Sequence, residues 1–580
     1  AGAEAAGTTL LPVRPWHSPL PWWTRGDVDG LMTMLSQNLA SMLIAAKLLH
    51  VTLSKGGEGI ADDIVYRRML PGMGVSMCFG CCYYAVQAQL LARSERRTDL
   101  CAQPFGISTP GIFVFVSSII GPAYVLCGGD AKRTWQIACL ANLIQGVVEV
   151  ACCVLGPYAV HVVSVGALLT ALANIGFSFL LTQPLQGLAA APLVALLPLV
   201  LLLLAQLADV RVPKLPTAVV PLVVAAVLGW GTGHLRASNV SESASVLGLH
   251  LPTLGLGIFS CFGEASRHIG IILPVALTNA IGTIQCQQMA QTAGDPYGVR
   301  TSMLGDGVAT ALAAILGCPY GFCIYIGHPA MKQMGCAVGY NLAMGVVVLL
   351  VCCSGAAAMI LSLVPVEGLN SFVIFVGLVV CVDALKVMPN RHWVAFMVGL
   401  VPGVCNWAAT QATDFATSVW PKGVPLPDFT DPSMWERDVT GAMEGLNALG
   451  SGYILSSMCL CSITMALIDR KFLAAAAWCF TSSFLSMVGL IHSLQMFLPW
   501  QRSLGSLPWQ FAFAYGLSGA LFLALSGLQA SGRLPRGPVD IDFAEPAEDD
   551  EMFASVVGQR YADKGTGHST VRTSFRRSYP

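Results

Sequence analysis

The segment Gln103-Pro-Phe-Gly-Ile-Ser-Thr-Pro110 interrupts an apolar run near residues 103–126. Thr109 suits a helix N-cap, and Pro110 suits the first helical position. The residue before a proline favours an extended backbone. We therefore predict that this segment is extended first and helical from Pro110 onward. In a membrane, such irregular backbone is tolerated only inside protein or beside a cavity.

A second segment, Gly321-Phe-Cys-Ile-Tyr-Ile-Gly-His-Pro329, repeats this arrangement later in the chain, with His328 before Pro329. Two spans that run extended first and helical second would meet near the middle of the membrane. Their helix N-termini would then direct free N–H groups towards one place. The alternative is a pair of ordinary proline kinks.

The composition places the chain in a bilayer. It has 580 residues, of which 55% are hydrophobic and 11% are charged, and its mean hydropathy is +0.66. A soluble chain carries roughly 25% charged residues, so this chain could not cover a water-facing surface. The net charge of −1 gives no indication of a nucleic-acid partner, and the 20 cysteines show neither a disulfide framework nor metal-ligand spacing.

Apolar runs of roughly 17–25 residues are read as membrane-spanning helices. The sequence contains fourteen such runs in two groups of seven, followed by two more. They lie near 28–52, 68–92, 103–126, 134–155, 157–181, 190–208, 214–231, 268–290, 299–318, 321–337, 338–363, 366–386, 391–409, 446–468, 472–498 and 508–530. Two groups of seven have opposite topology, which is typical of secondary transporters. We therefore predict an all-α polytopic membrane protein with a 7+7 inverted repeat, broken third and tenth spans, and two additional C-terminal spans.

The domain organisation follows from these runs. The predicted parts are an N-terminal cytoplasmic segment (1–27), the first repeat (28–231), a connecting loop (232–265), the second repeat (266–468), two additional spans (469–530) and a disordered cytoplasmic tail (531–580). The tail is too polar to fold alone. We expect a multi-pass protein of the lipid bilayer, with the plasma membrane favoured over an organelle.

Several short motifs carry a family resemblance. They are Gln103-Pro-Phe-Gly-Ile-Ser-Thr-Pro110, Asn279-Ala-Ile-Gly-Thr-Ile-Gln285, Ala293-Gly-Asp295, Leu304-Gly-Asp306-Gly, Ala314-Ile-Leu-Gly317 and Tyr325-Ile-Gly-His328-Pro329. With them, residues 22–468 resemble the nucleobase–ascorbate transporter family, also called xanthine/uracil/vitamin C permeases. The resemblance is strongest to the branch near the adenine/guanine/hypoxanthine permeases.

The resemblance implies a core of spans 1–4 and 8–11, a gate of spans 5–7 and 12–14, and elevator-type movement driven by a proton or sodium gradient. It also implies a homodimer through the gate and a nucleobase bound between the eighth span and the two broken spans. This chain departs from the family pattern at two positions. Asn279 stands where members carry an acidic residue, and Gly327, next to His328, stands where they carry Glu or Gln.

The residue types at the breaks suggest how a small planar substrate would bind. The amide of Asn279 offers donors and an acceptor in one plane, like the edge of a nucleobase. Phe105 and Tyr325 offer rings for stacking, and His328 suits a proton-coupled step because an unperturbed imidazole changes its charge near neutral pH. The predicted substrate-binding residues are Phe105, Ser108, Thr109, Asn279, Gln285, Tyr325, Gly327 and His328. Packing, helix capping or interhelical hydrogen bonds are the alternative roles for these side chains.

Two carboxylates inside spans are candidates for ion coupling or for support of the site. Asp306 lies in the ninth span and Glu149 in the fourth. An unpaired charge at such depth is expensive, so each carboxylate must be paired, solvated or protonated. We group them with His328 as coupling residues; a structural hydrogen bond is the alternative for each carboxylate.

The sequence favours transport of a small molecule over other functions. It contains no Ser/His/Asp set, no phosphate-binding glycine loop and no metal-ligand cluster, so we predict neither an enzyme nor a cofactor beyond a coupling H⁺ or Na⁺. The first hypothesis is a nucleobase carrier working by proton symport. An anion transporter of the same 7+7 fold is the second. A non-transporting receptor or scaffold acting through its tail is the third.

Overall fold

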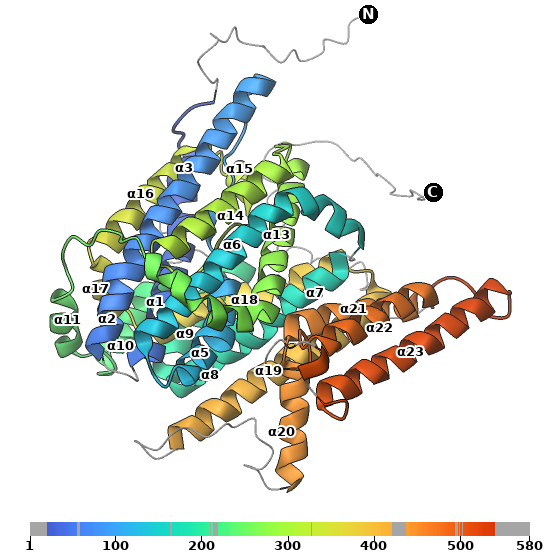
Figure 1. Cartoon of the computed structure of the whole chain (residues 1–580). Helices are drawn as coiled ribbons and strands as arrows, with labels where there is room; N and C mark the ends of the chain where they lie inside the picture. The colour runs from blue at the N-terminus through green and yellow to red at the C-terminus, as the bar shows by residue number, and fades with distance from the viewer. Residues whose placement is uncertain are drawn as a thin grey trace, which may run out of the picture. The chain divides into compact units, whose positions relative to one another are not determined.

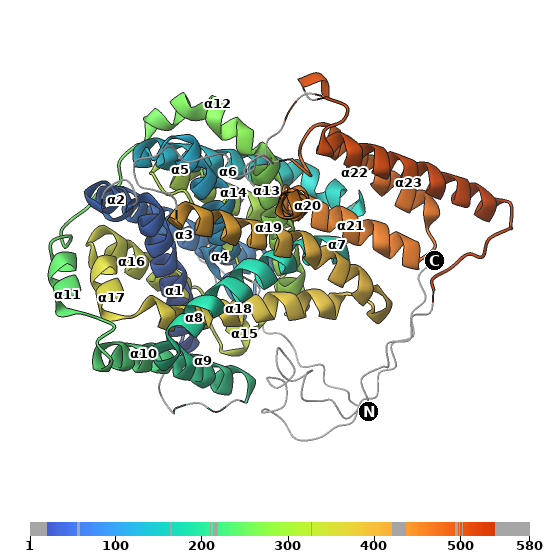
Figure 2. The same ribbon diagram turned by 90° about the horizontal axis from the view of Figure 1, so that it is seen from below.

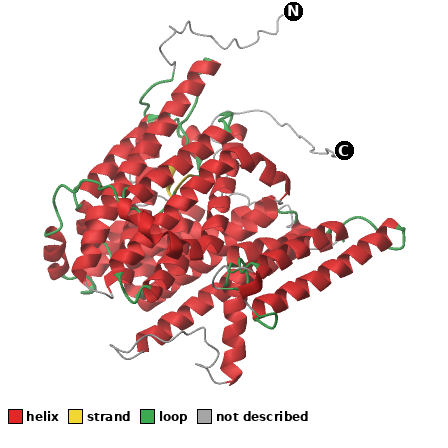
Figure 3. Cartoon of the chain, in the orientation of Figure 1, coloured by secondary structure: helices red, strands yellow, loops and turns green. Residues whose placement is uncertain are grey.

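The structure is a computed structural model, and the chain in it is almost entirely helical (Figures 1 and 3). It describes residues 20–54, 58–162, 165–208, 210, 212, 219–325, 327–419, 437–493, 497, 499–501 and 503–539. Most of the predicted N-terminal segment and of the predicted tail therefore lies outside the described residues.

The helices of the first half follow the predicted apolar runs. They are α1 (Gly26–Ser54), α2 (Glu58–Ile64), α3 (Leu70–Glu95), α4 (Thr109–Phe115), α5 (Gly121–Leu126), α6 (Ala131–Val162), α7 (Val165–Ile175), α8 (Gln183–Ala190), α9 (Pro192–Leu207) and α10 (Val219–Gly231). Short π-helical segments join α2 to α3, α4 to α5 and α7 to α8. These joins make continuous spans out of shorter helices.

The second half begins after a connecting segment that is not structureless, because it contains α11 (Ala237–Ala244) and α12 (Phe262–Ala265). Its helices are α13 (Ile269–Thr292), α14 (Val299–Ile315), α15 (His328–Gln333), α16 (Gly339–Cys353), α17 (Ala356–Leu363), α18 (Val366–Val387), α19 (Trp393–Val419), α20 (Arg437–Gly450) and α21 (Tyr453–Ile468). Helices α22 (Phe472–Met487) and α23 (Leu507–Ala530) follow and pack against each other (Figure 1).

Both predicted broken spans are present, and their extended segments pair with each other. Strand β1 (Phe105–Ile107) pairs antiparallel with β2 (Phe322–Ile324), so that Phe105 faces Ile324 in the register. The helices after the strands are capped by Ser108 and Gly327, one residue earlier than the sequence predicted. The third and tenth spans are thus extended first and helical second, and the alternative of simple proline kinks is wrong.

The two halves make matching contacts, as an inverted repeat requires. Helix α3 packs against α16, and its counterpart α14 packs against α6. In the same way, α1 packs against α16 and α13 packs against α6 (Figures 1 and 2). Exchanging the two halves converts the α3–α16 contact into the α14–α6 contact, and the α1–α16 contact into the α13–α6 contact. The repeat is therefore visible in the packing as well as in the order of the helices.

The number of full spans is smaller than the sixteen counted from the sequence. Among the described residues, eight helices are long and apolar enough to cross a membrane, or up to ten if each bent pair is one span. Helices such as α9 and α10 are short, and two predicted single spans are broken. The chain bends by 87° between α16 and α17, and by 84° between α20 and α21. Gly355 and Gly452 lie at these bends with φ of 72° and 66°, which glycine adopts without strain.

Close packing of α6 against α14 positions the polar residues described below. A Cβ added to Gly307 would lie 2.8 Å from the backbone nitrogen of Val150 and 2.9 Å from the carbonyl oxygen of Gly146. A Cβ on Gly146 would likewise meet the backbone of Ala311 at 2.7 Å. Glycine at both positions lets the two backbones approach directly, as in small-residue contacts of membrane helices.

A separate apolar cluster joins α7, α18, α19 and α21, the helices to which the family resemblance assigns the gate. Its buried residues are Ala167, Leu169, Ala173, Ala384, Met388, Ala395, Phe396, Leu400, Cys461 and Ile468. The largest cluster surrounds β1 and β2 and draws mainly on α1, α3, α6 and α16, but it also includes Ile175 on α7, Val373 on α18 and Tyr453 on α21. The helices therefore form two groups with partly distinct cores.

Candidate functional site

The structure brings together three polar side chains from the third, fourth and eighth spans. The Asn279 Nδ2 on α13 donates a hydrogen bond to Glu149 Oε1 on α6 at 3.0 Å. The Ser108 hydroxyl, at the start of α4, donates to Asn279 Oδ1 at 3.4 Å. Asn279 is half-buried, whereas Ser108 and Glu149 are 1% and 2% exposed. The contact places a carboxyl group of α6 beside the amide of Asn279.

Asp306, the second intramembrane carboxylate, is held by hydroxyl groups. Its Oδ1 accepts a hydrogen bond from the Tyr84 hydroxyl on α3, and its Oδ2 accepts one from Thr283 Oγ1 on α13, both at 2.6 Å. Thr283 is one helical turn after Asn279, and its hydroxyl also lies 3.2 Å from the Asn279 carbonyl oxygen. Asp306 therefore links α3, α13 and α14 next to the Asn279 turn.

Tyr325, Thr109 and Phe105 lie around the paired strands. The Tyr325 hydroxyl donates to the Ile107 carbonyl oxygen at 2.8 Å and lies 3.0 Å from Asn38 Oδ1 on α1. Thr109 Oγ1 lies 2.7 Å from the Ser41 hydroxyl. The Phe105 ring is fully buried and stacks on Phe322 with ring centres 5.6 Å apart. The Phe105 ring thus packs within the protein and is not part of the proposed site.

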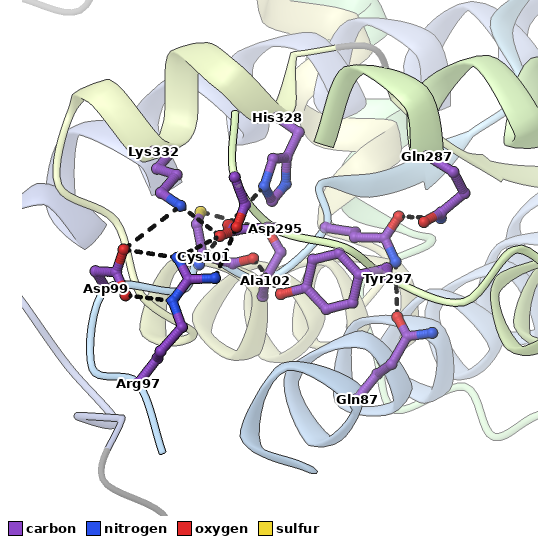
Figure 4. A network of polar contacts seen from close by, with 12 residues as sticks. Gln87, Arg97, Asp99, Cys101, Ala102, Gln287, Asp295, Tyr297, His328 and Lys332 are labelled. Atoms are coloured by element: carbon purple, nitrogen blue, oxygen red, sulfur yellow. Dashed lines mark hydrogen bonds and ion pairs between the residues drawn. The ribbon is translucent and has the colours of Figure 1, made fainter. Parts of the chain in front are cut away.

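His328 points to a different group of side chains, shown in Figure 4. Its Nε2 lies 2.9 Å from Asp295 Oδ2, in the loop between α13 and α14. The backbone N–H of Cys101, just before β1, donates to the same Asp295 oxygen at 3.1 Å. The structure therefore does not bring His328 into contact with Asn279, and it ties both broken spans to Asp295 instead.

Two cationic side chains complete the group around Asp295 (Figure 4). Lys332 on α15 forms an ion pair with Asp295, and Arg97 lies 3.6 Å from Asp295 Oδ1 while pairing with Asp99 at 2.7 Å. Burial by itself would raise the pKa of Asp295, but hydrogen bonds from His328 and Lys332 outweigh it. The pKa of Asp295 is consequently lowered, and the ionised carboxylate is the stable form.

The remaining predicted site residues lie as follows. Gly327 is the cap residue of α15, and a Cβ there would meet no atom within 4 Å. Gln285 belongs to α13, but its side chain lies outside the part of the structure that is described. The predicted set thus separates into one group around Asn279 and another around His328.

Sequence reasoning missed several polar residues of these groups. Gln145 Nε2 donates to Glu149 Oε1 at 2.9 Å, and Asn142 Nδ2 donates to the Cys318 carbonyl oxygen at 3.1 Å. Asn142, Gln145 and Glu149 are spaced by three and four residues, so this polar stripe along one face of α6 was visible in the sequence. Asp295 belongs to one of the motifs given above, but nothing local indicated that Arg97, His328 and Lys332 would lie around it.

The described residues contain no group of three or more His, Cys, Asp or Glu side chains arranged to hold a metal ion. The polar group around Asn279 is instead built from a single carboxyl group, amides and a hydroxyl. Such donors and acceptors bind uncharged polar ligands or hard cations rather than transition metals.

Comparison with known proteins finds similar chains among the solved structures. No family model matches the chain, and no curated protein matches it. Among solved structures, the chain is similar to the transmembrane domain of a cyanobacterium bicarbonate transporter BicA, with 16% sequence identity and a TM-score of 0.44. The match covers 68% of this chain and 97% of that one. At this level of similarity, the substrate of that protein is not transferred to this chain.

Proposed function

We propose that this protein is a membrane carrier for nucleobases, with Asn279, Ser108 and Glu149 forming the centre of its binding site. The observation that supports the proposal is the hydrogen bond from Asn279 to Glu149. The acidic group that the family carries on the eighth span is absent here, and Glu149 supplies one from the fourth span. An amide, a hydroxyl and a carboxylate together match the donor and acceptor pattern of a nucleobase edge.

The same contact weighs against the anion alternative. The hydrogen bonds described for Asn279, Ser108 and Glu149 join amides, a hydroxyl and a carboxyl and involve no cationic side chain, so an inorganic anion would meet no counter-charge there. The cationic side chains Arg97 and Lys332 already share Asp295. A neutral, planar base needs no counter-charge.

For the movement, we propose an elevator-type mechanism in which the helices around β1 and β2 shift relative to the α7, α18, α19 and α21 group. Support comes from the apolar cluster that α7, α18, α19 and α21 share with one another. Helices α7, α18 and α21 also contribute residues to the cluster around β1 and β2, and we propose that the two groups slide along this contact. The contacts that hold Ser108, Glu149 and Asn279 lie within the first group, so the site would travel with it.

Uptake of labelled compounds in a transporter-deficient host tests the proposal. The panel contains hypoxanthine, adenine, guanine, xanthine and uracil, with sulfate and bicarbonate as competing candidates. We expect saturable uptake of at least one base. Asn279→Ala should weaken its apparent affinity about tenfold, the effect of one lost hydrogen bond. Anion flux without base uptake would exclude the proposed substrate.

Trp500→Ala is the matched control, because this side chain is 77% exposed in the loop before α23 and touches neither polar group. Surface amounts of each variant are measured by labelling, so that a loss of uptake is separated from a loss of protein. Unchanged affinity in a folded Asn279→Ala protein would show that the site lies elsewhere.

A further inference from the structure

A hollow at one end of the helices collects basic side chains from three connections of the chain. It lies between the turn from α18 to α19, the turn from α21 to α22, and the segment after α23, and its volume is about 340 Å³. That volume is large enough for a small polar ligand. The charged residues that line it are Arg391, Asp469, Arg470, Lys471 and Arg536. Four of these side chains are cationic and one is a carboxylate.

Hydrogen bonds hold the connections together at this hollow. The Gln529 Nε2, at the end of α23, donates to the carbonyl oxygens of Arg470 and Pro535, both at 3.0 Å. The Val539 N–H donates to the Ile468 carbonyl oxygen at 2.7 Å. The segment after α23 therefore folds back onto the turn between α21 and α22, and the hollow has a defined wall on that side.

The single carboxylate positions part of the basic lining. Asp469 is 11% exposed, and its Oδ1 accepts a hydrogen bond from Arg391 Nε at 3.1 Å and lies 2.9 Å from His392 Nε2. Its Oδ2 pairs with Lys471 Nζ at 3.0 Å. Because Arg391 uses its Nε for this contact, the terminal nitrogens of its guanidinium group remain for a ligand.

The other two arginines have no counter-charge. In the part of the chain that the structure describes, neither Arg470 nor Arg536 forms an ion pair. Arg470 also has a φ of 53°, in the left-handed region where glycine commonly ends a helix. Glycine would form this turn with less strain, so the geometry of the turn does not account for an arginine there.

The hollow lies where membrane spans end, at the level of lipid headgroups. Helix α18 ends at Val387, α21 at Ile468 and α23 at Ala530. Leu473 in the first turn of α22 and Leu528 in the last turn of α23 are 63% and 38% exposed. An apolar surface thus begins beside the hollow and continues along these helices, which suits the acyl chains of a bound lipid.

We propose that this hollow binds the phosphorylated headgroup of an anionic membrane lipid. Arginine presents a planar fork of N–H donors that matches phosphate oxygens, and lysine adds a compact charge. Four cationic side chains around one carboxylate leave an excess positive charge, which a phosphate monoester with roughly two negative charges offsets. Basic pockets between helices at a membrane surface bind such headgroups.

The proposed lipid site belongs to the two additional helices rather than to the part of the chain with the family resemblance. Its wall needs Gln529 and the segment after α23, which lie beyond residue 468. A bound headgroup would link the end of the second repeat to α22 and α23 by contacting all three connections. The inference does not depend on which substrate the protein carries.

The test titrates the purified full chain, in an uncharged detergent, with dioctanoyl phosphatidylinositol 4-phosphate. Two other probes are dioctanoyl phosphatidylinositol, which lacks the monoester phosphate, and glycerophosphoinositol 4-phosphate, which has the same headgroup without acyl chains. The readout is the apparent melting temperature, which a ligand of the folded state raises in a saturable way. We expect the phosphorylated lipid to reach half-saturation at a concentration about tenfold below that of either other probe.

Variants locate the binding. Arg470→Gln and Arg536→Gln should each raise the half-saturating concentration of the phosphorylated lipid about fivefold, the effect of one basic residue at an anionic lipid surface. Arg533→Gln is the matched control, because it removes the same charge from an exposed residue of the same segment that does not line the hollow. We expect this control to keep the wild-type response.

Equal responses of the wild-type protein to phosphatidylinositol and to its 4-phosphate would overturn the proposal, and this result needs no variant to fold. Equal half-saturation by the headgroup without acyl chains would also overturn it, because the ligand would then be a soluble phosphate compound. Equal losses in Arg533→Gln and Arg536→Gln would show general surface charge rather than this site. Base uptake enters none of these measurements, so a failure of the proposed substrate is distinguished from a failure of the lipid site.

Discussion

Asp295 has no exposed side-chain surface, yet His328, Lys332, Arg97 and the Cys101 backbone all contact it. The segment before β1 and the helix after β2 are therefore tied to one carboxylate. Removing one partner of a buried ion pair leaves the other charges uncompensated, which is more damaging than the loss of a surface pair.

The first prediction concerns this carboxylate. Asp295→Asn should lower the free energy of unfolding by about 3 kcal/mol at neutral pH, because Lys332 loses its buried counter-charge and His328 loses a carboxylate partner. Thermal unfolding of the purified chain measures the change. Asp99→Asn is the control, since the Asp99 side chain is 62% exposed and its pair with Arg97 should contribute about 1 kcal/mol or less. Equal effects of the two substitutions would contradict the role given to Asp295.

The second prediction is a pH dependence with a definite sign. The pKa of Asp295 is lowered from its ordinary value of 3.8, so the folded state favours the ionised form. Its contribution to stability is present above that value and is lost as the pH falls through the lowered pKa. Wild-type stability should therefore decrease below about pH 4, and less so in Asp295→Asn. Parallel acid transitions in the two proteins would contradict this assignment.

Among the elements, α6 and α14 form the contact on which the site depends most. Gly146 and Gly307 bring the two backbones together. Asp306 directly precedes Gly307, and Glu149 follows Gly146 by three residues. The neighbours of an added Cβ are backbone atoms, which cannot move aside without separating the helices.

The third prediction tests this contact. Gly307→Ala should destabilise the protein by about 1–3 kcal/mol through overpacking, and it should also reduce uptake by shifting Glu149 relative to Asn279. Gly527→Ala on α23 is the matched control, because a Cβ there meets no atom within 4 Å. We expect that control to be neutral or slightly stabilising, since alanine favours a helix more than glycine does. Thermal unfolding and initial uptake rates measure both effects.

At the scale of the whole molecule, the two additional helices are anchored to the end of the second repeat. His492, in the segment between α22 and α23, has a ring 3.9 Å from that of Phe511 on α23. Its Nδ1 lies 2.9 Å from the Ala448 carbonyl oxygen on α20, and its backbone N–H donates to Ser451. The segment that precedes α23 thus packs against the bend at Gly452.

The fourth prediction follows from this anchor. His492→Ala should lower stability by about 1–3 kcal/mol, because it leaves buried acceptors without a donor and removes the ring stacking. It should also increase protease cleavage between α22 and α23. Trp500→Ala, in the same segment but exposed, should change neither property. A protease pattern like that of the wild type in His492→Ala would show that other contacts hold the helix pair.

Much of the architecture could be predicted from the sequence, because the signals are local. Low charge and long apolar runs require a bilayer, and a proline after a polar residue marks each broken span. The matching positions of Pro110 and Pro329 indicated the inverted repeat, and the paired strands confirm that both spans are broken. The bends at Gly355 and Gly452 were missed, because a glycine within an apolar run has the same sequence signal whether the helix continues or ends.

The candidate site was predictable only in part. The sequence by itself determined that buried carboxylates at Glu149 and Asp306 need partners, since no charge is stable alone in a membrane. Only the tertiary structure decided which partners they have: Glu149 meets Asn279 across 130 positions of chain, and His328 turns to Asp295 instead. Side-chain partners from distant spans depend on how closely α6, α13 and α14 pack, and that distance is set by the fold as a whole rather than by any local pattern.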